Sequence, residues 1–440
     1  MARFAIVTFG CRVNQADSLR IEEDLRARGN EEAPARDADL VIVNTCSVTA
    51  TADQGARQTI RRIARENPCA RIVATGCYAT RCGGEVAALP NVVRVVRNDE
   101  KQDFIDAVAR DFSRASAVAE GAHVVRDAQM RTTHQGPCGK PIAPGIAGRT
   151  AFTLRVQTGC EERCSYCIIP TTRGASRSVP IAEVVREVER VAQAGFKEIA
   201  LTGVHLGSYG RDLADPCSLA DLLRALDGVD ADVQFRISSL EPMDCTREIV
   251  DVIAHRERFL PHFHLPLQHA SNRMLRAMRR PYTLEYYRRL VDEIREQLPH
   301  ASIGSDMIVG FPGESDADFA ANLAYLPGSP LTHLHVFPYS DRPGTAASSL
   351  PEKVHGGVVR GRGLALRRIA AELTTRFQSA QAGTVRPGLT LEDGTLVVTD
   401  NYLKVRVPRG LRRNVRVHVR IEQTSPFMSG AIVPAATPAA

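Results

Sequence analysis

Three cysteines lie close together near the middle of the chain, in the stretch Gly159-Cys160-Glu-Glu-Arg-Cys164-Ser-Tyr166-Cys167. Thiolates are the usual protein ligands of iron–sulfur clusters. Because a cubane cluster has four irons, three thiolates leave one iron open to another ligand. Structural zinc is the alternative, since it needs four closed ligands and Cys138 or His205 is available as the fourth. The C-x3-C-x2-C spacing favours a cluster, but ligand counting alone leaves zinc open.

Three more cysteines, Cys11, Cys46 and Cys77, each follow a short apolar run that is typical of a buried strand. In an open α/β sheet, ligands bind at the carboxyl ends of the strands. We therefore expect these cysteines to meet at one edge of a sheet. Single cysteines elsewhere are interpreted as buried hydrophobic residues; they are Cys69, Cys82, Cys138, Cys217 and Cys245.

Alternating strands and helices must position both sets of cysteines. The first segment predicts a parallel sheet, with strands at Arg3–Phe9, Leu40–Asn44, Arg71–Thr75 and Val92–Val96, and helices at Asp17–Arg28 and Ala52–Glu66. A second series predicts a partial (βα)6 barrel, with catalytic residues after its strands. Its expected strands are Thr153–Gln157, Glu198–Thr202, Gln234–Ser238, His262–Leu265, Ser302–Val309 and Leu331–Phe337, and its helices include Ala182–Ala194, Leu284–Gln297 and an exit helix at Val358–Ala382.

The fold class is therefore α/β, and the chain divides into four segments. They are an N-terminal open parallel sheet domain at 1–125, a Gly/Pro-rich linker at 126–150, the partial barrel at 151–382, and a small β-barrel with a disordered tail at 383–440. The β-barrel is indicated by β-branched runs around an Asp-Gly turn between Val385 and Glu422. The tail begins at Ile432.

Size, charge and cysteine content restrict the class of protein. A chain of 440 residues with 44% hydrophobic content can bury a large core. No apolar run is long enough to span a membrane and no secretory leader is evident, so we expect a cytoplasmic protein. Because the cytosol keeps thiols reduced, we then expect the eleven cysteines not to form disulfides. The net charge is +6, with basic residues concentrated after Lys353, which favours a polyanionic partner or a solvated basic surface.

Taken together, these stretches resemble the methylthiotransferase family of radical S-adenosylmethionine (SAM) enzymes over nearly the whole chain. The motifs that carry the resemblance, besides the cysteine triplet, are Gly10-Cys11-Arg-Val-Asn14-Gln15, Asn44-Thr45-Cys46, Thr75-Gly76-Cys77-Tyr78, Leu201-Thr-Gly203-Val-His205, Ser238-Ser-Leu-Glu241-Pro242, His264-Leu-Pro-Leu-Gln268 and Asp306-Met-Ile-Val-Gly310-Phe-Pro-Gly313-Glu314. The C-terminal barrel resembles the TRAM RNA-binding module at Asn401–Val405. It departs from that pattern at Leu396–Thr399, where a Gly-His pair is often found.

The resemblance implies two [4Fe-4S] clusters and SAM. Cys160, Cys164 and Cys167 would hold the cluster that delivers an electron to SAM, giving a 5′-deoxyadenosyl radical. Cys11, Cys46 and Cys77 would hold an auxiliary cluster carrying the sulfur that is methylated and transferred. A radical suits this reaction, because the aromatic C–H that becomes C–S–CH3 is not acidic. In such enzymes the cofactor carries the hard chemistry, and the protein positions and shields it.

Three substrate types occur in the family, and this sequence looks most like the type acting on threonylcarbamoyladenosine 37 of tRNA. The stretches behind that choice include Cys46-Ser-Val-Thr49, Leu206-Gly-Ser-Tyr-Gly210 and Phe337-Pro-Tyr-Ser340. The other types act on isopentenyladenosine 37 of tRNA or on an aspartate of a small-subunit ribosomal protein. The electron donor and the sulfur source are not specified by the sequence.

Further site residues are expected from their positions after the barrel strands. Tyr166, Gly203, Ser239, Glu241, Gln268 and Gly310 are candidates for binding SAM, with ordinary packing or a buried hydrogen bond as the competing role for each. Arg57, Arg61 and Arg62 could meet tRNA phosphates or form a solvated helix face. The low aromatic content predicts phosphate contacts plus one pocket for an extruded base, not broad stacking platforms.

Two other hypotheses remain at this point. A zinc-containing RNA-binding protein without catalysis would use four closed ligands. A radical SAM enzyme with merely structural N-terminal cysteines would carry one cluster instead of two.

Overall fold

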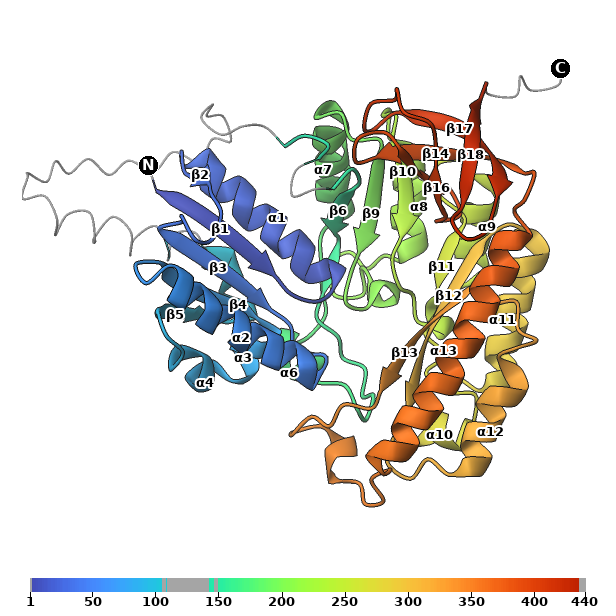
Figure 1. The fold of residues 1–440 in the computed structure, drawn as a ribbon, viewed down its shortest axis with the longest axis horizontal. Coiled ribbons are helices and arrows are strands. Elements are labelled where there is room, and N and C mark those ends of the chain that lie inside the picture. Colours follow the sequence, from blue (N-terminus) through green and yellow to red (C-terminus); the bar gives the residue numbers. More distant parts are fainter. Residues whose placement is uncertain (1, 105–107, 109–141, 146–148, 435–440) are drawn as a thin grey trace, which may run out of the picture. The chain divides into compact units, whose positions relative to one another are not determined.

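The computed structural model describes residues 2–104, 108, 142–145 and 149–434, which form two compact units (Figure 1). The first unit comprises the chain up to Pro141 together with Thr171–Gly174, and the second comprises Ile142–Pro170 and everything from Ala175 onward. Most of the expected linker at 126–150 lies outside the described residues, although Ile142 is buried in the core of the second unit. Over the described part of the chain, every helix is too short or too polar to cross a bilayer.

The first unit is built on a five-stranded sheet in the order β2-β1-β3-β4-β5. Its parallel arrangement was predicted, whereas the short edge strand β2 was not. Its strands are β1 (Arg3–Thr8), β2 (Glu31–Glu32), β3 (Leu40–Thr45), β4 (Arg71–Gly76) and β5 (Val92–Val96). Its helices are α1 (Arg12–Ala27), α2 (Ala50–Glu66), α3 (Cys77–Arg81), α4 (Gly83–Ala87) and the 3-10 helix η1 (Asn98–Asp103). Helix α1 packs through Ile21 and Leu25 on one face of the sheet, and α2 packs through Ala56 and Ile60 on the other. The helix predicted to begin at Asp17 begins at Arg12.

The second unit contains the six parallel strands of a partial barrel, which confirms the predicted architecture. They are β6 (Phe152–Arg155), β9 (Glu198–Thr202), β10 (Gln234–Ile237), β11 (His262–His264), β12 (Ser302–Val309) and β13 (His333–Pro338). They form two sheets, β10-β9-β6 and β11-β12-β13, joined by a bridge between Phe235 and Phe259. A short antiparallel pair, β7 (Gln157–Thr158) and β8 (Arg177–Ser178), was not expected from the sequence.

Helices cover one face of these strands. They are α6 (Ile169–Arg173, partly in the first unit), α7 (Ile181–Gln193), α8 (Leu219–Asp227), α9 (Arg247–His255), α10 (Asn272–Ala277), α11 (Leu284–Gln297), α12 (Asp316–Tyr325) and α13 (Gly356–Ser379), with 3-10 turns η3 (Leu206–Ser208), η4 (Pro242–Asp244) and η5 (Ala346–Ser349). Phe263, Met307 and Leu334 enter the same hydrophobic core as the buried residues of these helices. Since strand side chains alternate between faces, their neighbours along each strand lie on the opposite, inner face.

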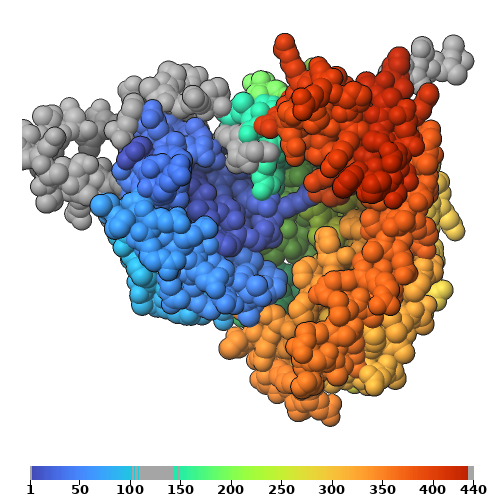
Figure 2. All heavy atoms as spheres, in the orientation of Figure 1, coloured from blue at the N-terminus to red at the C-terminus, as the bar shows by residue number. Residues whose placement is uncertain are grey.

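The chain ends in a closed β-barrel with the strand order β14-β15-β16-β18-β17. Its strands are β14 (Val385–Leu391), β15 (Leu396–Thr399), β16 (Lys404–Arg406), β17 (Arg416–Gln423) and β18 (Ser429–Val433). Helix α13 leads up to it along the second unit, and the two form one continuous surface of that unit (Figure 2). The prediction that the disordered tail begins at Ile432 is wrong, because Ile432 and Val433 belong to β18 and pair with Val419 and His418 of β17. Residues 435–440 lie outside the described part.

The small barrel is tied to the partial barrel by buried polar contacts. Arg236 of β10 is almost fully buried and donates to the Glu198 carboxylate (2.9 Å) and to the carbonyl oxygen of Asp400 (3.0 Å). Asn401 donates to the carbonyl oxygen of His300 (2.9 Å). Part of the TRAM-like motif therefore faces the partial barrel and holds the two barrels together.

Candidate metal and cofactor site

The structure brings Cys11, Cys46 and Cys77 to one edge of the first sheet, after β1, β3 and β4. Burial raises the pKa of the Cys46 thiol to about 11, and a hydrogen bond from the Val48 N–H opposes this, while the neighbouring Cys11 and Cys77 thiols add to it. Cys46 and Cys77 are buried, whereas Cys11 is exposed. The predicted meeting of these cysteines is present in the structure.

Two glycines make this close approach possible. Gly10 has φ +90°, and a Cβ there would lie 2.6 Å from the Cys46 sulfur. Gly76 has φ +96°, and a Cβ there would lie 2.2 Å from the Thr45 carbonyl oxygen. Left-handed backbone is strained for any residue with a Cβ. The glycines of the two Gly-Cys pairs are therefore required by the fold of the site.

A buried cation, Arg173, completes this edge. Its guanidinium donates to the Asn14 amide oxygen (2.5 Å) and to the Asp17 carboxylate (3.3 Å), and Asp17 also accepts from Lys101 (2.8 Å). Burial opposes the charge on Arg173, but Cys77 and Asp17 outweigh it, so its pKa is raised. Arg173 belongs to the Thr171–Gly174 segment, which is far along the chain from Cys11, Cys46 and Cys77. The sequence patterns around those three cysteines therefore gave no signal for it.

The second set, Cys160, Cys164 and Cys167, follows β7 in the other unit. Burial raises the pKa of the Cys167 thiol to about 12, and the Cys164 and Cys160 thiols are close enough to contribute. Arg280 donates to the Cys164 sulfur (2.9 Å), to the Tyr282 hydroxyl (3.0 Å) and to the Glu241 carboxylate. A buried arginine thus stands beside this set of thiols as well.

His205, one of the two expected fourth zinc ligands, lies beside this set without closing a zinc site. Its Nδ1 is 3.9 Å from the Cys160 sulfur and its Nε2 is 2.7 Å from the Asp244 carboxylate. Burial opposes protonation of His205, but the bonds to Asp244 and Cys160 prevail and raise its pKa to about 9. The other candidate, Cys138, lies outside the described residues.

The thiol geometry fits a cluster better than a single ion. Tetrahedral zinc holds its thiolates about 2.3 Å away and therefore about 3.8 Å from one another. Among the residues that the structure describes, neither set has its ligating atoms all within 4.8 Å of one another. A cubane spreads its thiolates over different irons, so wider spacing suits it. Buried thiols with raised pKa values also need a nearby metal to become thiolates.

The six candidate SAM residues occupy different environments around the strand ends. Glu241 is paired with Arg280. Tyr166 packs against a group of buried hydrophobic side chains that includes Met274 and Met278. Gly310 has φ +76°, its N–H donates to Glu314 (2.5 Å), and a Cβ would lie 2.5 Å from Val359, so its own packing already requires glycine.

The remaining three also differ in exposure. Gln268 is buried beside β12 with φ +68°, whereas Ser239 is exposed. Gly203 lies against Leu206 and Gln157. Their roles in SAM binding stay predictions.

Arg57, Arg61 and Arg62 separate into two groups. Arg57 donates to the Tyr78 hydroxyl (2.9 Å) and pairs with Glu85, whereas Arg61 and Arg62 are exposed on α2. Only the last two therefore remain available for a phosphate.

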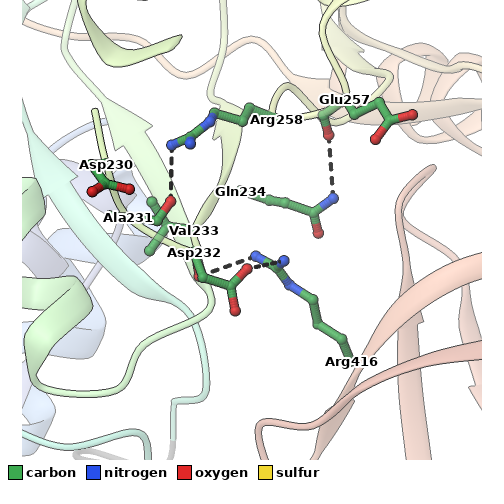
Figure 3. A pocket seen from close by; sticks show the side chains of 8 residues that line it. All are labelled: Asp230, Ala231, Asp232, Val233, Gln234, Glu257, Arg258 and Arg416. Carbon is green, nitrogen blue, oxygen red and sulfur yellow. Dashed lines mark hydrogen bonds and ion pairs between the residues drawn. The ribbon is translucent and has the colours of Figure 1, made fainter. Parts of the chain in front are cut away.

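A polar cleft at the other end of the partial barrel is shown in Figure 3. Arg416 of β17 donates to Asp232, and Gln234 and Arg258 donate to backbone carbonyls across it. Gln234 is the first residue of β10, so the cleft lies at the amino end of that strand. Catalytic residues of such barrels lie at the carboxyl ends, and we assign no part of the reaction to this cleft.

Comparisons with known proteins agree with this geometry. Residues 3–97 match "Uncharacterized protein family UPF0004" and residues 154–326 match the "Radical SAM superfamily". The chain is 35% identical over 405 residues to the threonylcarbamoyladenosine tRNA methylthiotransferase MtaB of Aquifex aeolicus, covering 92% of this chain and 96% of that relative. The chain belongs to the MtaB-type radical SAM methylthiotransferases. It is also 34% identical to the ribosomal protein uS12 methylthiotransferase RimO of Acidothermus cellulolyticus, covering 86% of this chain and 82% of that one.

Methylthiotransferases of this type are transferases that use SAM and carry two [4Fe-4S] clusters, and this is the cofactor complement of the chain. The radical SAM methyltransferase TsrM of Kitasatospora setae has a similar fold, with a TM-score of 0.53 at 17% identity over 79% of this chain and 74% of that one. The number of three-cysteine sets equals this number of clusters, and the assignment of each set to a cluster stays a prediction. Membership of this family excludes the hypothesis of a non-catalytic zinc protein, which the cysteine spacing alone had left open.

Proposed function

We propose that this methylthiotransferase converts N6-threonylcarbamoyladenosine at position 37 of tRNA into its 2-methylthio derivative, in the cytoplasm. The observation that carries the proposal is the match to four MtaB relatives over 91–93% of the chain at 31–35% identity. The match to a RimO relative covers less of both chains.

Within this proposal, Cys160, Cys164 and Cys167 hold the cluster that binds SAM, and Cys11, Cys46 and Cys77 hold the auxiliary cluster. When bound, the clusters and SAM supply the radical that removes the C2 hydrogen and the methylthio group that replaces it. The chain's residues position and shield this chemistry. Arg280 and Arg173 offset the negative charge that three thiolates bring into each buried edge.

The surface of the small barrel suits an RNA partner. Its exposed basic residues, besides Arg416, which pairs with Asp232, are Lys404, Arg406, Arg409, Arg412 and Arg420. The Arg406 guanidinium lies 4.2 Å from the ring centre of Phe427, which is itself 59% exposed. Such pairs can contact a phosphate and a base at neighbouring positions. We therefore expect tRNA binding to weaken as the salt concentration rises.

The test compares RNA products of the anaerobically reconstituted protein. Anticodon stem-loops carrying threonylcarbamoyladenosine, isopentenyladenosine or adenosine at the target position are incubated with SAM and a reductant, and their nucleosides are analysed by mass spectrometry. We expect a methylthio product from the first RNA. Product from the isopentenyl RNA alone, or from a ribosomal uS12 substrate alone, would replace the proposal by that alternative.

Cluster assignment is tested on the same protein by iron analysis. We expect about eight irons per chain, and about four after Ala substitution of either cysteine set. Substitution of Cys11, Cys46 and Cys77 should abolish methylthio transfer while SAM cleavage persists. If this variant lost SAM cleavage as well, the division of labour between the two sets would be wrong.

A further inference from the structure

The inner face of β11–β13 carries four histidines at matched positions. His262 and His264 are two residues apart in β11, and His333 and His335 are two residues apart in β13, so each pair points to one face. Strand β12 lies between them, with Gly304 level with His264 and His333 and Asp306 level with His335. Phe263 and Leu334, which alternate with the histidines, face the helices.

These imidazoles form part of a continuous row of rings. Tyr402 of the small barrel lies 4.5 Å from His262, and His262 stacks on His333 at 6.1 Å, with ring planes 5° apart. His333 lies 5.6 Å from His335, and His335 lies 6.4 Å from Phe337. We call these five rings, together with His264, which lies beside His333 and His335, the imidazole row.

Gly304 makes room for the row. A Cβ at Gly304 would lie 2.1 Å from Nε2 of His333, so any side chain there would displace the ring. The row is therefore built by the absence of a side chain on the central strand as well as by the rings themselves.

Asp306 orients the polar end of the row. Its Oδ1 accepts from His264 Nε2 (3.0 Å) and from His335 Nδ1 (3.2 Å). Burial opposes ionisation of Asp306, but these two bonds prevail and lower its pKa, so it is an acceptor at neutral pH. The hydrogen bond to Asp306 raises the pKa of His335, and 56% of that side chain is exposed. His335 therefore presents its other nitrogen, Nε2, to solvent, and this nitrogen donates a hydrogen bond when the ring is protonated.

We propose that the imidazole row binds the modified base and that His335 reads the carboxylate of its N6 substituent, which deepens and rests on the proposed function. The threonylcarbamoyl group is a threonine in urea linkage and carries a carboxylate, whereas an isopentenyl group is apolar. A charge-assisted hydrogen bond from His335 suits the first and offers nothing to the second.

The position of the row supports this reading. It runs from Tyr402 at the amino ends of the strands to Phe337, which is level with Ile308 of β12. Gly310 directly follows that strand, two residues after Ile308. The expected SAM residues follow those same strand ends. Stacking on flat rings tolerates any base, so the polar group at His335 would supply the discrimination. The low aromatic content of the chain did not reveal this surface, because histidine is not counted among the aromatic residues.

A divalent metal ion is the competing occupant, since His264, Asp306 and His335 offer two imidazoles and a carboxylate within 4.8 Å of one another. The base is favoured for two reasons. Asp306 already accepts a hydrogen from both imidazoles without an ion. The row also extends through four further rings, Tyr402, His262, His333 and Phe337, which a metal site does not need.

The experiment measures binding of the three stem-loop RNAs by fluorescence anisotropy, using reconstituted full-length protein. We expect wild type to bind the threonylcarbamoyl RNA more tightly than the adenosine RNA, and His335→Phe to lower that preference about tenfold or more while keeping a ring in place. Gly304→Ala should lower it too, although every histidine remains. His255→Phe, an exposed histidine on α9, is the matched control and should leave it unchanged.

Each outcome is decisive once iron content and circular dichroism show that the variants are folded. If wild type makes the methylthio product but both variants keep the wild-type preference, the inference is wrong and the proposed function stands. If wild type forms no product from the threonylcarbamoyl RNA, the proposed function itself fails. If protein lacking all six cluster cysteines retains one zinc or manganese ion that His335→Phe loses, the row is a metal site and the inference is overturned.

Discussion

Replacing Arg280 by Met should lower the reduction potential of the cluster held by Cys160, Cys164 and Cys167. The Arg280 guanidinium lies 2.9 Å from the Cys164 sulfur and is almost fully buried. Reduction adds negative charge to the cluster, and a neighbouring cation stabilises that charge. Without the cation, the reduced state is less favourable and the potential falls.

The magnitude follows from Coulomb's law. At an effective dielectric constant of about 20, unit charges about 4 to 8 Å apart interact by about 2–4 kcal/mol. At about 59 mV for 1.4 kcal/mol in a one-electron step, this corresponds to about 90–175 mV. Glu241, which pairs with Arg280, offsets part of the field. We therefore expect a fall near the lower end, about 90 mV.

The assay is a redox titration followed by electron paramagnetic resonance, in protein whose Cys11, Cys46 and Cys77 are Ala so that one cluster is observed. Arg280→Lys should keep most of the potential because it keeps the charge. Arg279→Met is the matched control, since Arg279 is exposed and its charge is screened by water and salt. A potential in Arg280→Met within about 20 mV of the parent protein would refute the electrostatic role.

Three further changes have expected outcomes. Arg236→Met leaves the Glu198 carboxylate buried and unpaired, so it should lower the free energy of unfolding in urea by about 3–5 kcal/mol, and adding Glu198→Leu should restore most of it. Gly76→Ala forces a Cβ onto the Thr45 carbonyl at positive φ, so iron analysis should show the loss of about four irons while SAM cleavage remains. Burial lowers the pKa of His333 to about 4, so between pH 6.5 and 4 a proton binds the unfolded chain but not the folded one. The free energy of unfolding should therefore decrease as the pH is lowered from 6.5 to 4, by up to about 1.4 kcal/mol per pH unit. His333→Gln should make that decrease smaller in denaturation curves.

Local patterns in the sequence were sufficient for the longer parallel strands and for the placement of the cysteines after them, but not for the two-residue strands β2, β7 and β8. The run Leu40–Thr45 is fully buried on both faces, so its continuous apolar character is the signal of a central parallel strand. Helix α1 begins earlier than predicted because Val13 and Asn14 are buried too, and an asparagine does not look like a core residue. Burial of Asn14 is tolerated because its side-chain amide donates hydrogen bonds to the carbonyl oxygens of Phe9 and Thr45.

The arginines beside the thiols could not be predicted from local patterns. Arg280 is 116 residues from Cys164 and Arg173 is 156 residues from Asp17 along the chain, so only the fold shows that they are neighbours. The imidazole row is different, because His-Phe-His and His-Leu-His within two predicted strands already place each pair of histidines on one face.

The buried cations beside the two thiol sets are neutralised by carboxylates to different extents, and this difference affects the reduction potentials of the clusters. In the first unit, Arg173 and Lys101 share the single carboxylate of Asp17. In the second unit, Arg280 is matched by Glu241 and His205 by Asp244. Asp244 also pairs with Arg211, but that side chain is 61% exposed, so water and salt screen its charge. The first set therefore has the more positive surroundings, which favour the reduced, more negative state.

We accordingly expect the cluster on Cys11, Cys46 and Cys77 to have the higher reduction potential, when each cluster is titrated alone in the absence of SAM. This order suits the proposed roles, because electron transfer to SAM needs the stronger reductant, whereas a cluster that holds a sulfur atom does not. The reverse order, measured in the two triple-Ala proteins, would show that solvent exposure of Cys11 or backbone hydrogen bonds to the sulfurs outweigh the nearby charged side chains. Electrostatic matching would then no longer explain why a buried arginine accompanies each set.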